Sequence, residues 1–254
     1  MDGRTVLVTG GGSGMGRLAC ELMSQRGARV AAFDVNEAGL AETAGGAKGI
    51  RTWRVDVTDF AAVRAAVDEV EASLGPVFRV YNAAAIMPFG KLTEQDNPTI
   101  HRVMQINYGG LVNIAQATVP GMVSRGAGDF VSFSSMSGII PTLFTGAYNA
   151  SKFAVSAFTE VLYHENIDSG VRFACVCPPP VATPLLQQGW ATVMPKTVSN
   201  MEPIAPREVL DAIEAALEKG QFWVFPGKGT RRGYVMRRWF PNLIWKGVHK
   251  NESE

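Results

Sequence analysis

The sequence predicts an α/β fold, a single domain built on a doubly wound parallel sheet of about seven strands with helices on both faces. Short runs rich in β-branched and aromatic residues alternate with longer helical patterns along the chain, as in strands joined by crossover helices. The runs are almost continuously apolar, which strands buried on both faces require. The 254 residues, 46% of them hydrophobic, are enough for one such core.

The elements follow one another regularly. The expected strands are TVLV (5–8), RVAAF (29–33), TWRV (52–55), VFRVY (77–81), DFVSF (129–133), VRFACV (171–176) and QFWVF (221–225). A helix is expected at 14–26, directly after glycines that end the first strand, and another follows the second strand. The stretch FAAVRAAVDEVEASLG (60–75) has apolar residues at helical spacing. No linker interrupts residues 1–227, which we expect to form the domain, with a substrate lid at about 183–205.

Composition narrows the class of protein. With 24 basic and 23 acidic residues the net charge is +1, which gives no general attraction to nucleic acid or membrane. Cys20, Cys175 and Cys177 provide neither an even disulfide framework nor two CxxC pairs, which favours reduced thiols in the cytoplasm. Neither a signal peptide nor a run of ~18 apolar residues is apparent. We therefore expect a cytoplasmic protein with no metal site and no nucleic-acid partner.

The first turn is rich in glycine. Residues 9–16 read TGGGSGMG, between the first strand and the first helix. Glycines permit positive φ and close approach of the backbone to a ligand, and a helix N-terminus suits a pyrophosphate. An ordinary strand-to-helix turn is the alternative, but a glycine turn in this position is the context that a dinucleotide-binding fingerprint requires.

A carboxylate ends the second strand. Asp34 lies about 20 residues beyond the glycines, where it can accept hydrogen bonds from a ribose and repel a 2′-phosphate. No basic residue follows it directly, and Ser13 occupies the loop position from which a basic side chain would meet that phosphate. The sequence therefore favours NAD over NADP as the cofactor.

A second motif stands near the middle of the chain. Tyr148 and Lys152 are four residues apart, so a helix presents both on one face. A nearby ammonium and a positively charged nicotinamide ring would lower the pKa of a tyrosine toward the working range. Ser135 follows the strand that ends at Phe133, at the sheet edge where ligands collect. Its hydroxyl can hold a substrate oxygen while Tyr148 exchanges the proton.

Together the spacing TGxxxGxG, with Gly10, Gly14 and Gly16, and the pair Tyr148-x-x-x-Lys152 resemble the short-chain dehydrogenase/reductase family in its classical subgroup. The resemblance extends to about residue 225 and implies a Rossmann-type fold. It places Asn107 in a proton relay and implies homodimers or homotetramers formed through helices around 107–125 and 150–168. The cofactor contacts that we expect are Gly10, Ser13, Gly14, Met15, Gly16, Asp34, Asp56, Val57, Asn82, Tyr148, Lys152, Pro178, Val181 and Thr183.

Some of these positions have other interpretations. Asp56 precedes Thr58 and can equally belong to helix capping. Asn82 is more typical of a structural residue beside the cofactor than of a proton donor. The family usually has Pro-Gly after the sixth strand, but Pro178 is followed here by Pro179, which forbids positive φ and removes an N–H donor.

The substrate side is apolar. The residues that we expect to line it are Met87, Phe89, Ile140, Phe144, Leu185 and Trp190. Such walls suit a small molecule with a bulky hydrophobic body, such as a hydroxysteroid or a long-chain or aromatic secondary alcohol, better than a sugar. Packing of the lid or of a subunit interface is the alternative explanation for these residues.

Residues 228–254 form a basic and aromatic extension. Between Lys228 and Lys250 there are seven Lys or Arg and no acid, interleaved with Tyr234, Trp239, Phe240 and Trp245. Peripheral contact with a membrane surface is one interpretation. Packing across the pocket or against a partner subunit is the other.

The predicted function is that of an NAD-dependent alcohol dehydrogenase or ketone reductase, with Ser135, Tyr148, Lys152 and Asn107 as catalytic residues. Three rivals remain. One is a reductase of a thioester-carried or quinone-like carbonyl. Another is a sensor or scaffold that binds NAD without turnover, for which the four catalytic residues would be unnecessary. The third is a peripheral membrane protein in which the C-terminal extension carries the main function.

Overall fold

The computed structural model describes residues 1–190, 193 and 195–253. It confirms the predicted fold class. Seven parallel strands form one sheet in the order β3-β2-β1-β4-β5-β6-β7. The strands are β1 (Thr5–Thr9), β2 (Arg29–Asp34), β3 (Ile50–Arg54), β4 (Val77–Asn82), β5 (Gly128–Phe133), β6 (Val171–Val176) and β7 (Trp223–Val224).

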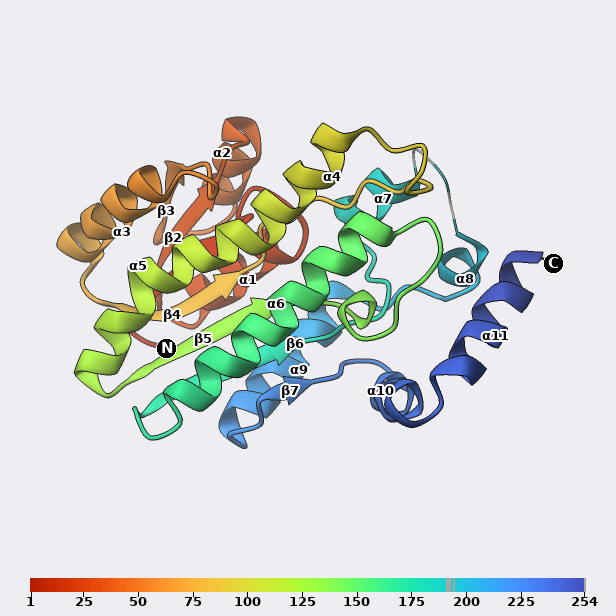
Figure 1. Cartoon of the computed structure of the whole chain (residues 1–254). Helices are drawn as coiled ribbons and strands as arrows, with labels where there is room; N and C mark the ends of the chain where they lie inside the picture. The colour runs from red at the N-terminus through yellow and green to blue at the C-terminus, as the bar shows by residue number, and fades with distance from the viewer. Residues whose placement is uncertain (191–192, 194, 254) are drawn as a thin grey trace.

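Helices cover both faces of the sheet (Figure 1). One face carries α3 (Phe60–Leu74), α5 (Gly110–Arg125) and α6 (Gly146–Glu165), whose Val63, Leu111 and Val155 belong to one buried core. The other face carries α1 (Gly14–Gln25), α2 (Glu37–Gly46) and α9 (Pro206–Glu218), which bury Ala19, Leu40 and Val209 in a second core. Apolar strands are therefore required throughout, because side chains leave the sheet on both sides.

Local signals explain where the helices begin and end. Asp59 accepts a hydrogen bond from the Ala62 N–H at the start of α3, and Gly75 ends that helix with φ +87°. Gly126 ends α5 in the left-handed conformation. These are the short polar N-caps and C-terminal glycines that helix ends favour.

The strand order reverses between β1 and β4, since the chain crosses from one half of the sheet to the other at this point. In open α/β sheets a crevice opens there, outside the carboxyl ends of the strands. The connections on this edge carry α4 (Asn97–Met104), the π-helix η1 (Gln105–Gly109), the 3₁₀ turn η2 (Met136–Gly138), α7 (Pro184–Trp190) and α8 (Lys196–Ser199).

The last two helices, α10 (Thr230–Trp239) and α11 (Pro241–Ser253), lie beyond the carboxyl ends of the strands, with α11 beside α8 (Figure 1). No helix among the described residues is long and apolar enough to cross a membrane.

Candidate active site

The turn between β1 and α1 is a backbone cradle. Gly10 and Gly14 have φ of +67° and +51°, and a Cβ on Gly16 would lie 2.1 Å from the Gly10 carbonyl oxygen. Only glycine fits such a close approach. Ser13 precedes the helix in an extended conformation, and its side chain makes no capping hydrogen bond. The first N–H groups of α1 are therefore left for an anionic ligand.

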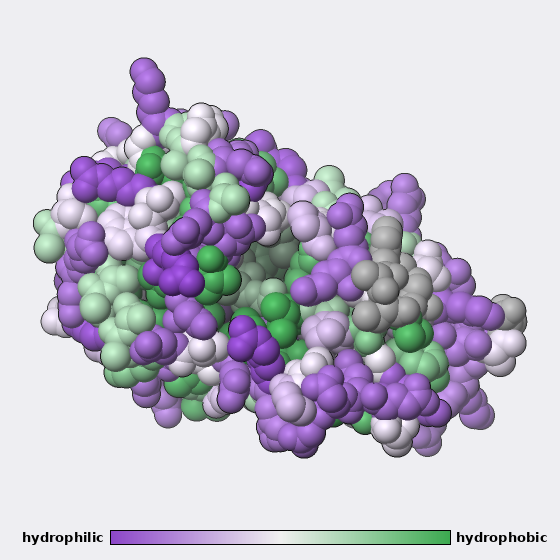
Figure 2. Space-filling model, turned by 90° about the horizontal axis from the view of Figure 1, so that it is seen from above, coloured by the Kyte–Doolittle hydropathy of each residue, from purple (hydrophilic) through white to green (hydrophobic). Residues whose placement is uncertain are grey.

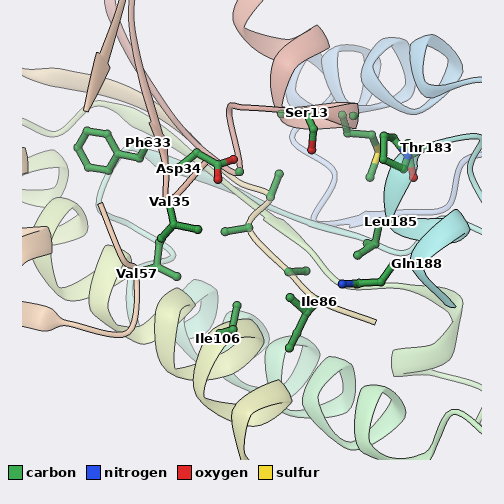
Figure 3. Close-up of a pocket in the computed structure, with 18 of the residues that line it drawn as sticks. Ser13, Phe33, Asp34, Val35, Val57, Ile86, Ile106, Thr183, Leu185 and Gln188 are labelled. Atoms are coloured by element: carbon green, nitrogen blue, oxygen red, sulfur yellow. The ribbon is translucent and has the colours of Figure 1, made fainter. Parts of the chain in front are cut away.

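Asp34 stands beside this cradle with its carboxylate held in place. Its Oδ2 accepts a hydrogen bond from the Gly12 N–H at 2.9 Å, and its Oδ1 accepts one from the Asn36 N–H at 3.0 Å. Asp34 and the glycines line a cavity of about 390 Å³. Figure 3 shows the cavity between Asp34 and Val35 on one side and Thr183, Leu185 and Gln188 on the other.

Three further expected cofactor contacts are Asp56, Val57 and Asn82, and they lie in different surroundings. Asp56 and Val57 line the same cavity, and hydrogen bonds from the Thr58 N–H and hydroxyl hold the pKa of Asp56 below its ordinary value. Asn82 lines neither this cavity nor the larger cavity beside Tyr148 that is described below. Its Oδ1 accepts a hydrogen bond from the Thr9 hydroxyl at 3.1 Å, which ties β4 to β1 behind the glycine turn.

Ser135, Tyr148 and Lys152 meet at the carboxyl end of β5. Lys152 Nζ donates to the Phe133 carbonyl oxygen at 2.7 Å and lies 5.6 Å from the centre of the Tyr148 ring. The Ser135 hydroxyl oxygen accepts a hydrogen bond from the Ser137 N–H at 3.0 Å, which orients it. Tyr148 and Lys152 are both buried and Ser135 is half-buried, so the chain brings a phenol and an amine together away from water, with a hydroxyl beside them.

Burial controls the pKa values of this group. It raises the pKa of Tyr148 to about 12, although the hydrogen bond with Ser135 opposes the rise. It lowers the pKa of Lys152 to about 8. The expected lowering of the tyrosine pKa is therefore absent in the protein alone, because loss of hydration outweighs the influence of the neighbouring side chains.

Asn107 lies in the π-helix η1 and is buried. Its Oδ1 accepts from the Ile86 N–H at 2.9 Å, while its Nδ2 donates to the Ile86 carbonyl oxygen and to the Ser151 hydroxyl oxygen, both at 3.0 Å. The amide side chain therefore fixes the segment after β4 against α6. π-turns of this kind often accompany functional sites.

A second cavity, of about 510 Å³, opens in front of Ser135 and Tyr148. Seen from above, the molecule is hollowed at its centre, with hydrophobic residues on the walls of the hollow (Figure 2). Of the expected pocket residues, Met87, Phe89, Ile140 and Leu185 line this cavity. The cofactor positions Pro178, Val181 and Thr183 line it too. So does Pro179, next to a carbonyl oxygen of Pro178 that accepts the Met136 N–H at 2.9 Å.

Phe144 is not among the residues that line this cavity. Phe144 has φ +62°, unusual for a residue with a side chain, and its carbonyl oxygen accepts the Gly90 N–H at 2.7 Å. It lines neither cavity, so its place in the pocket wall stays a prediction. The side chain of Trp190 lies outside the described residues.

The two cavities adjoin. Met15, Ala83, Ala85, Thr183 and Leu185 line both of them. A ligand held along the glycine turn would thus reach the space in front of Tyr148. Gln188 closes the boundary from α7, since its Oε1 accepts the Met87 N–H at 3.0 Å.

The C-terminal helices supply lining residues that sequence reasoning left undecided. Lys228, Thr230, Gly233, Ile244, Val248 and Asn251 all border the larger cavity. A Cβ on Gly233 would lie 3.2 Å from Ile140 Cδ1 and 3.3 Å from Met136 Cε, so α10 packs closely on the loop that follows Ser135. A glycine inside a basic helical stretch was the one sequence signal for this packing. Arg102 and Gln188, which border the smaller cavity, carried no such signal.

Glu252 fastens α11 to α8. Its Oε1 and Oε2 accept the N–H groups of Thr197 and Lys196 at 2.8 and 3.1 Å. Burial raises the pKa of Glu252, but these hydrogen bonds outweigh it and hold the pKa below its ordinary value. The carboxylate therefore binds the otherwise free N–H groups at the start of α8.

This arrangement is an open α/β sheet that carries a glycine turn, a buried tyrosine, a buried lysine and a half-buried serine near its switch point. A family model described as short chain dehydrogenase matches residues 4–193. The galactitol 2-dehydrogenase (L-tagatose-forming) of Cereibacter sphaeroides is 38% identical over 188 residues, which cover 72% of this chain and 73% of that protein. The 2,5-dichloro-2,5-cyclohexadiene-1,4-diol dehydrogenase of Sphingobium indicum is 34% identical over 191 residues, with coverage of 74% and 76%.

Among solved structures, a short chain dehydrogenase/reductase from Burkholderia phymatum in complex with NAD matches with a TM-score of 0.85 at 26% identity, over 95% of both chains. The chain belongs to the short-chain dehydrogenase/reductase family, as its glycine turn and Tyr-Lys pair predicted.

Proposed function

We propose that this protein is an NAD(H)-dependent oxidoreductase that interconverts a secondary alcohol and a ketone on a bulky hydrophobic substrate. The observation that carries the proposal is the half-buried Ser135 beside the buried Tyr148 and Lys152, a group that faces an apolar cavity next to the glycine cradle. A scaffold that only bound a nucleotide would have no use for a buried phenol and amine in front of a second cavity.

The residues of the smaller cavity fit a nicotinamide dinucleotide. The uncapped N-terminus of α1 suits its pyrophosphate, and the Asp34 carboxylate, fixed by Gly12 and Asn36, suits a ribose. Because a 2′-phosphate would meet this carboxylate, NAD is favoured over NADP. The Burkholderia phymatum structure, which is a complex with NAD, supports this choice. The bound dinucleotide supplies hydride chemistry.

The proton chemistry belongs to the protein. Ser135 holds the substrate oxygen, and Tyr148 gives that oxygen a proton in ketone reduction or removes it in alcohol oxidation. Lys152, whose pKa is about 8, is mostly an ammonium at neutral pH and stabilises a phenolate next to it. Asn107 keeps its proposed place in the relay, where its side chain holds the Ile86 segment and the backbone of η1 borders α6.

The walls of the larger cavity support the proposed substrate class. Met87, Phe89, Ile140 and Leu185 are apolar, and the C-terminal helices add Ile244 and Val248. Such a lining binds a bulky hydrophobic alcohol by burial of apolar surface. A second candidate is a diol or polyol, because both relatives named above are dehydrogenases of such compounds.

The test is NADH formation by the purified protein with hydroxysteroids, long-chain and aromatic secondary alcohols, and galactitol. We expect turnover with one hydrophobic class and a loss of about 10²–10⁴-fold in Tyr148→Phe, the usual contribution of general acid–base catalysis. Tyr163→Phe, which removes a hydroxyl from the same helix where the ring stacks on Phe222, is the matched control and should retain activity.

Turnover of galactitol alone would replace the hydrophobic substrate by a polyol. Tight NADH binding without turnover of any alcohol would favour a thioester or quinone-like carbonyl, or binding without catalysis. Equal activity in Tyr148→Phe and wild type would overturn the assigned role of the tyrosine.

We also propose that the protein forms a homodimer or homotetramer through α5 and α6. Phe153 and Val161 are exposed on α6 at 39% and 56%, which supports an apolar contact on this surface.

A further inference from the structure

Helices α10 and α11 meet in a corner that presents apolar and basic side chains together. On α10, Arg231, Val235, Arg238 and Trp239 are spaced so that they share one helical face, and all four are exposed. Phe240 and Leu243 continue this surface where α11 begins. We call these six residues the basic corner.

The apolar members of the corner are unusually exposed. Trp239 is 70% exposed, Phe240 57% and Leu243 56%. Tryptophan is highly buried on average, so an isolated chain gains nothing from holding one in water. Tryptophan and phenylalanine beside arginines are typical of the boundary between lipid headgroups and acyl chains.

The charge of the corner is concentrated and unpaired. Residues 228–250 contain seven Lys or Arg and no acid, which leaves 17 basic against 23 acidic residues in the rest of the chain. Among the described residues, no salt bridge holds Arg231, Arg238 or Lys246. The partner that complements this surface is therefore anionic on the outside and apolar beneath.

The opposite sides of the same helices face the substrate cavity. Gly233 of α10 and Ile244, Val248 and Asn251 of α11 line it. A surface that covers the basic corner would therefore lie against the same two helices that wall the cavity of about 510 Å³. A hydrophobic alcohol dissolved in lipid would have only this helical layer to pass.

We propose that the basic corner docks the protein on an anionic lipid surface and that substrate enters the cavity from this surface. The second half rests on the proposed function, whereas the docking does not. A second copy of the chain is a poor occupant, because two corners in contact would bring their clustered positive charges together.

The experiment measures binding of the full chain to vesicles of phosphatidylcholine alone and of phosphatidylcholine mixed with phosphatidylserine. We expect binding to the mixed vesicles only, weakened by added salt. Each basic residue at an anionic surface contributes about 1 kcal/mol, so R231E/R238E should lower the partition coefficient at least about 30-fold. W239S/F240S should lower it at least about tenfold, through loss of apolar burial.

Matched controls carry the same changes elsewhere. K48E/R51E reverses two exposed charges in and next to β3, at the edge of the sheet opposite β7. F60S/I167S removes two exposed apolar side chains. All variants should unfold at the wild-type temperature and oxidise a water-soluble alcohol at the wild-type rate. Both controls should bind mixed vesicles like the wild type.

Absence of wild-type binding to mixed vesicles, or equal losses in the control pairs, would overturn the docking proposal. So would a wild-type dimer that W239S/F240S dissociates without any vesicle binding, since the corner would then be a subunit interface. Vesicle binding without alcohol turnover would sink the proposed function alone, and turnover without vesicle binding would sink the docking alone.

Discussion

Tyr148 and Lys152 show how one physical cause acts on two residues in opposite directions. Burial disfavours charge, so the phenol becomes a weaker acid, with a pKa of about 12, and the ammonium a stronger one, with a pKa of about 8. Before any ligand binds, Tyr148 is therefore a neutral phenol. This is the state that donates a proton to a ketone, while alcohol oxidation needs added positive charge near the ring.

The lowered pKa of Lys152 predicts a pH-dependent stability. Between about pH 8, its value in the folded protein, and about pH 10, its value in an unfolded chain, the unfolded state binds more protons. The contribution of this residue to the free energy of unfolding therefore rises with pH over that window. Lys152→Met removes this contribution, and urea unfolding of both proteins from about pH 8 to pH 10 measures the difference.

The pH range over which Lys152 changes the stability ends before the ionisation of Tyr148 begins to affect it. Tyr148 would begin to oppose folding only above about pH 10, where free phenols ionise. Identical pH slopes for wild type and Lys152→Met would show that the lysine is not desolvated as the structure indicates.

At the scale of residues, the sequence predicted the side chains that gather at the site but not the hydrogen bonds that hold the neighbouring segments in place. Ser135, Tyr148 and Lys152 follow from a strand end and helical spacing, and they do come together. The side-chain bonds of Asn107 to Ile86 and of Asn82 to Thr9 depend on how distant segments stack. No local pattern in the sequence encodes such contacts.

At the scale of elements, α8 is held by a helix distant in sequence. Glu252 of α11 accepts the N–H groups of Lys196 and Thr197, so α8 is attached to the wall of the larger cavity. The strands and long helices were predictable within a few residues, because two-sided burial leaves a strong pattern. The helix expected at 60–75 runs Phe60–Leu74, for example. The packing of α10 and α11 was not predictable, since a basic amphipathic stretch fits a pocket wall or a surface equally well.

Replacing Glu252 by alanine should loosen the attachment of α8 to the wall of the larger cavity. We expect the KM for a bulky alcohol to rise about three- to tenfold, with kcat nearly unchanged, because a hydrogen bond to a charged group in partial contact with water contributes about 1.5 kcal/mol or less. Steady-state kinetics of Glu252→Ala measures this, with Glu218→Ala at the exposed end of α9 as control.

The pH dependence of this contact has a definite sign. Because the pKa of Glu252 lies below its ordinary value, its stabilising contribution is present above that ordinary value and is lost as pH falls through the lowered one. The KM difference between wild type and Glu252→Ala should therefore be constant across neutral pH. A difference that vanished near neutrality would contradict the contact.

At the scale of the whole molecule, a buried ion-pair network lies at the edge of the sheet opposite the candidate active site. Asp129, fully buried near the amino end of β5, accepts hydrogen bonds from Arg79 at 2.7 Å and from Arg172 at 2.6 Å. Arg79 also pairs with Glu214 of α9 at 2.6 Å. This network ties β4, β5, β6 and α9 together at the edge opposite the active site. Its residues lie in three separate strands and a helix, so the sequence alone did not reveal it.

Asp129→Asn should therefore destabilise the protein without changing its chemistry. Breaking a buried ion pair on one side costs about 3–5 kcal/mol, and denaturant unfolding measures the loss. Asp211→Asn, which breaks an exposed pair with Arg207, should cost less than about 1 kcal/mol. Both variants should keep the kcat/KM of the wild type per folded molecule, and a fall in Asp129→Asn would show that the two edges of the sheet are coupled.

The cavity wall has a consequence for how such enzymes diverge. The family match ends at residue 193, yet Gly233, Ile244 and Val248 border the larger cavity, in which we propose that the substrate binds. Selection can therefore rewrite this wall while the residues that move the proton stay untouched. Descendants of one ancestor that share the first part of the chain are then free to acquire unlike alcohols through changes in their last helices.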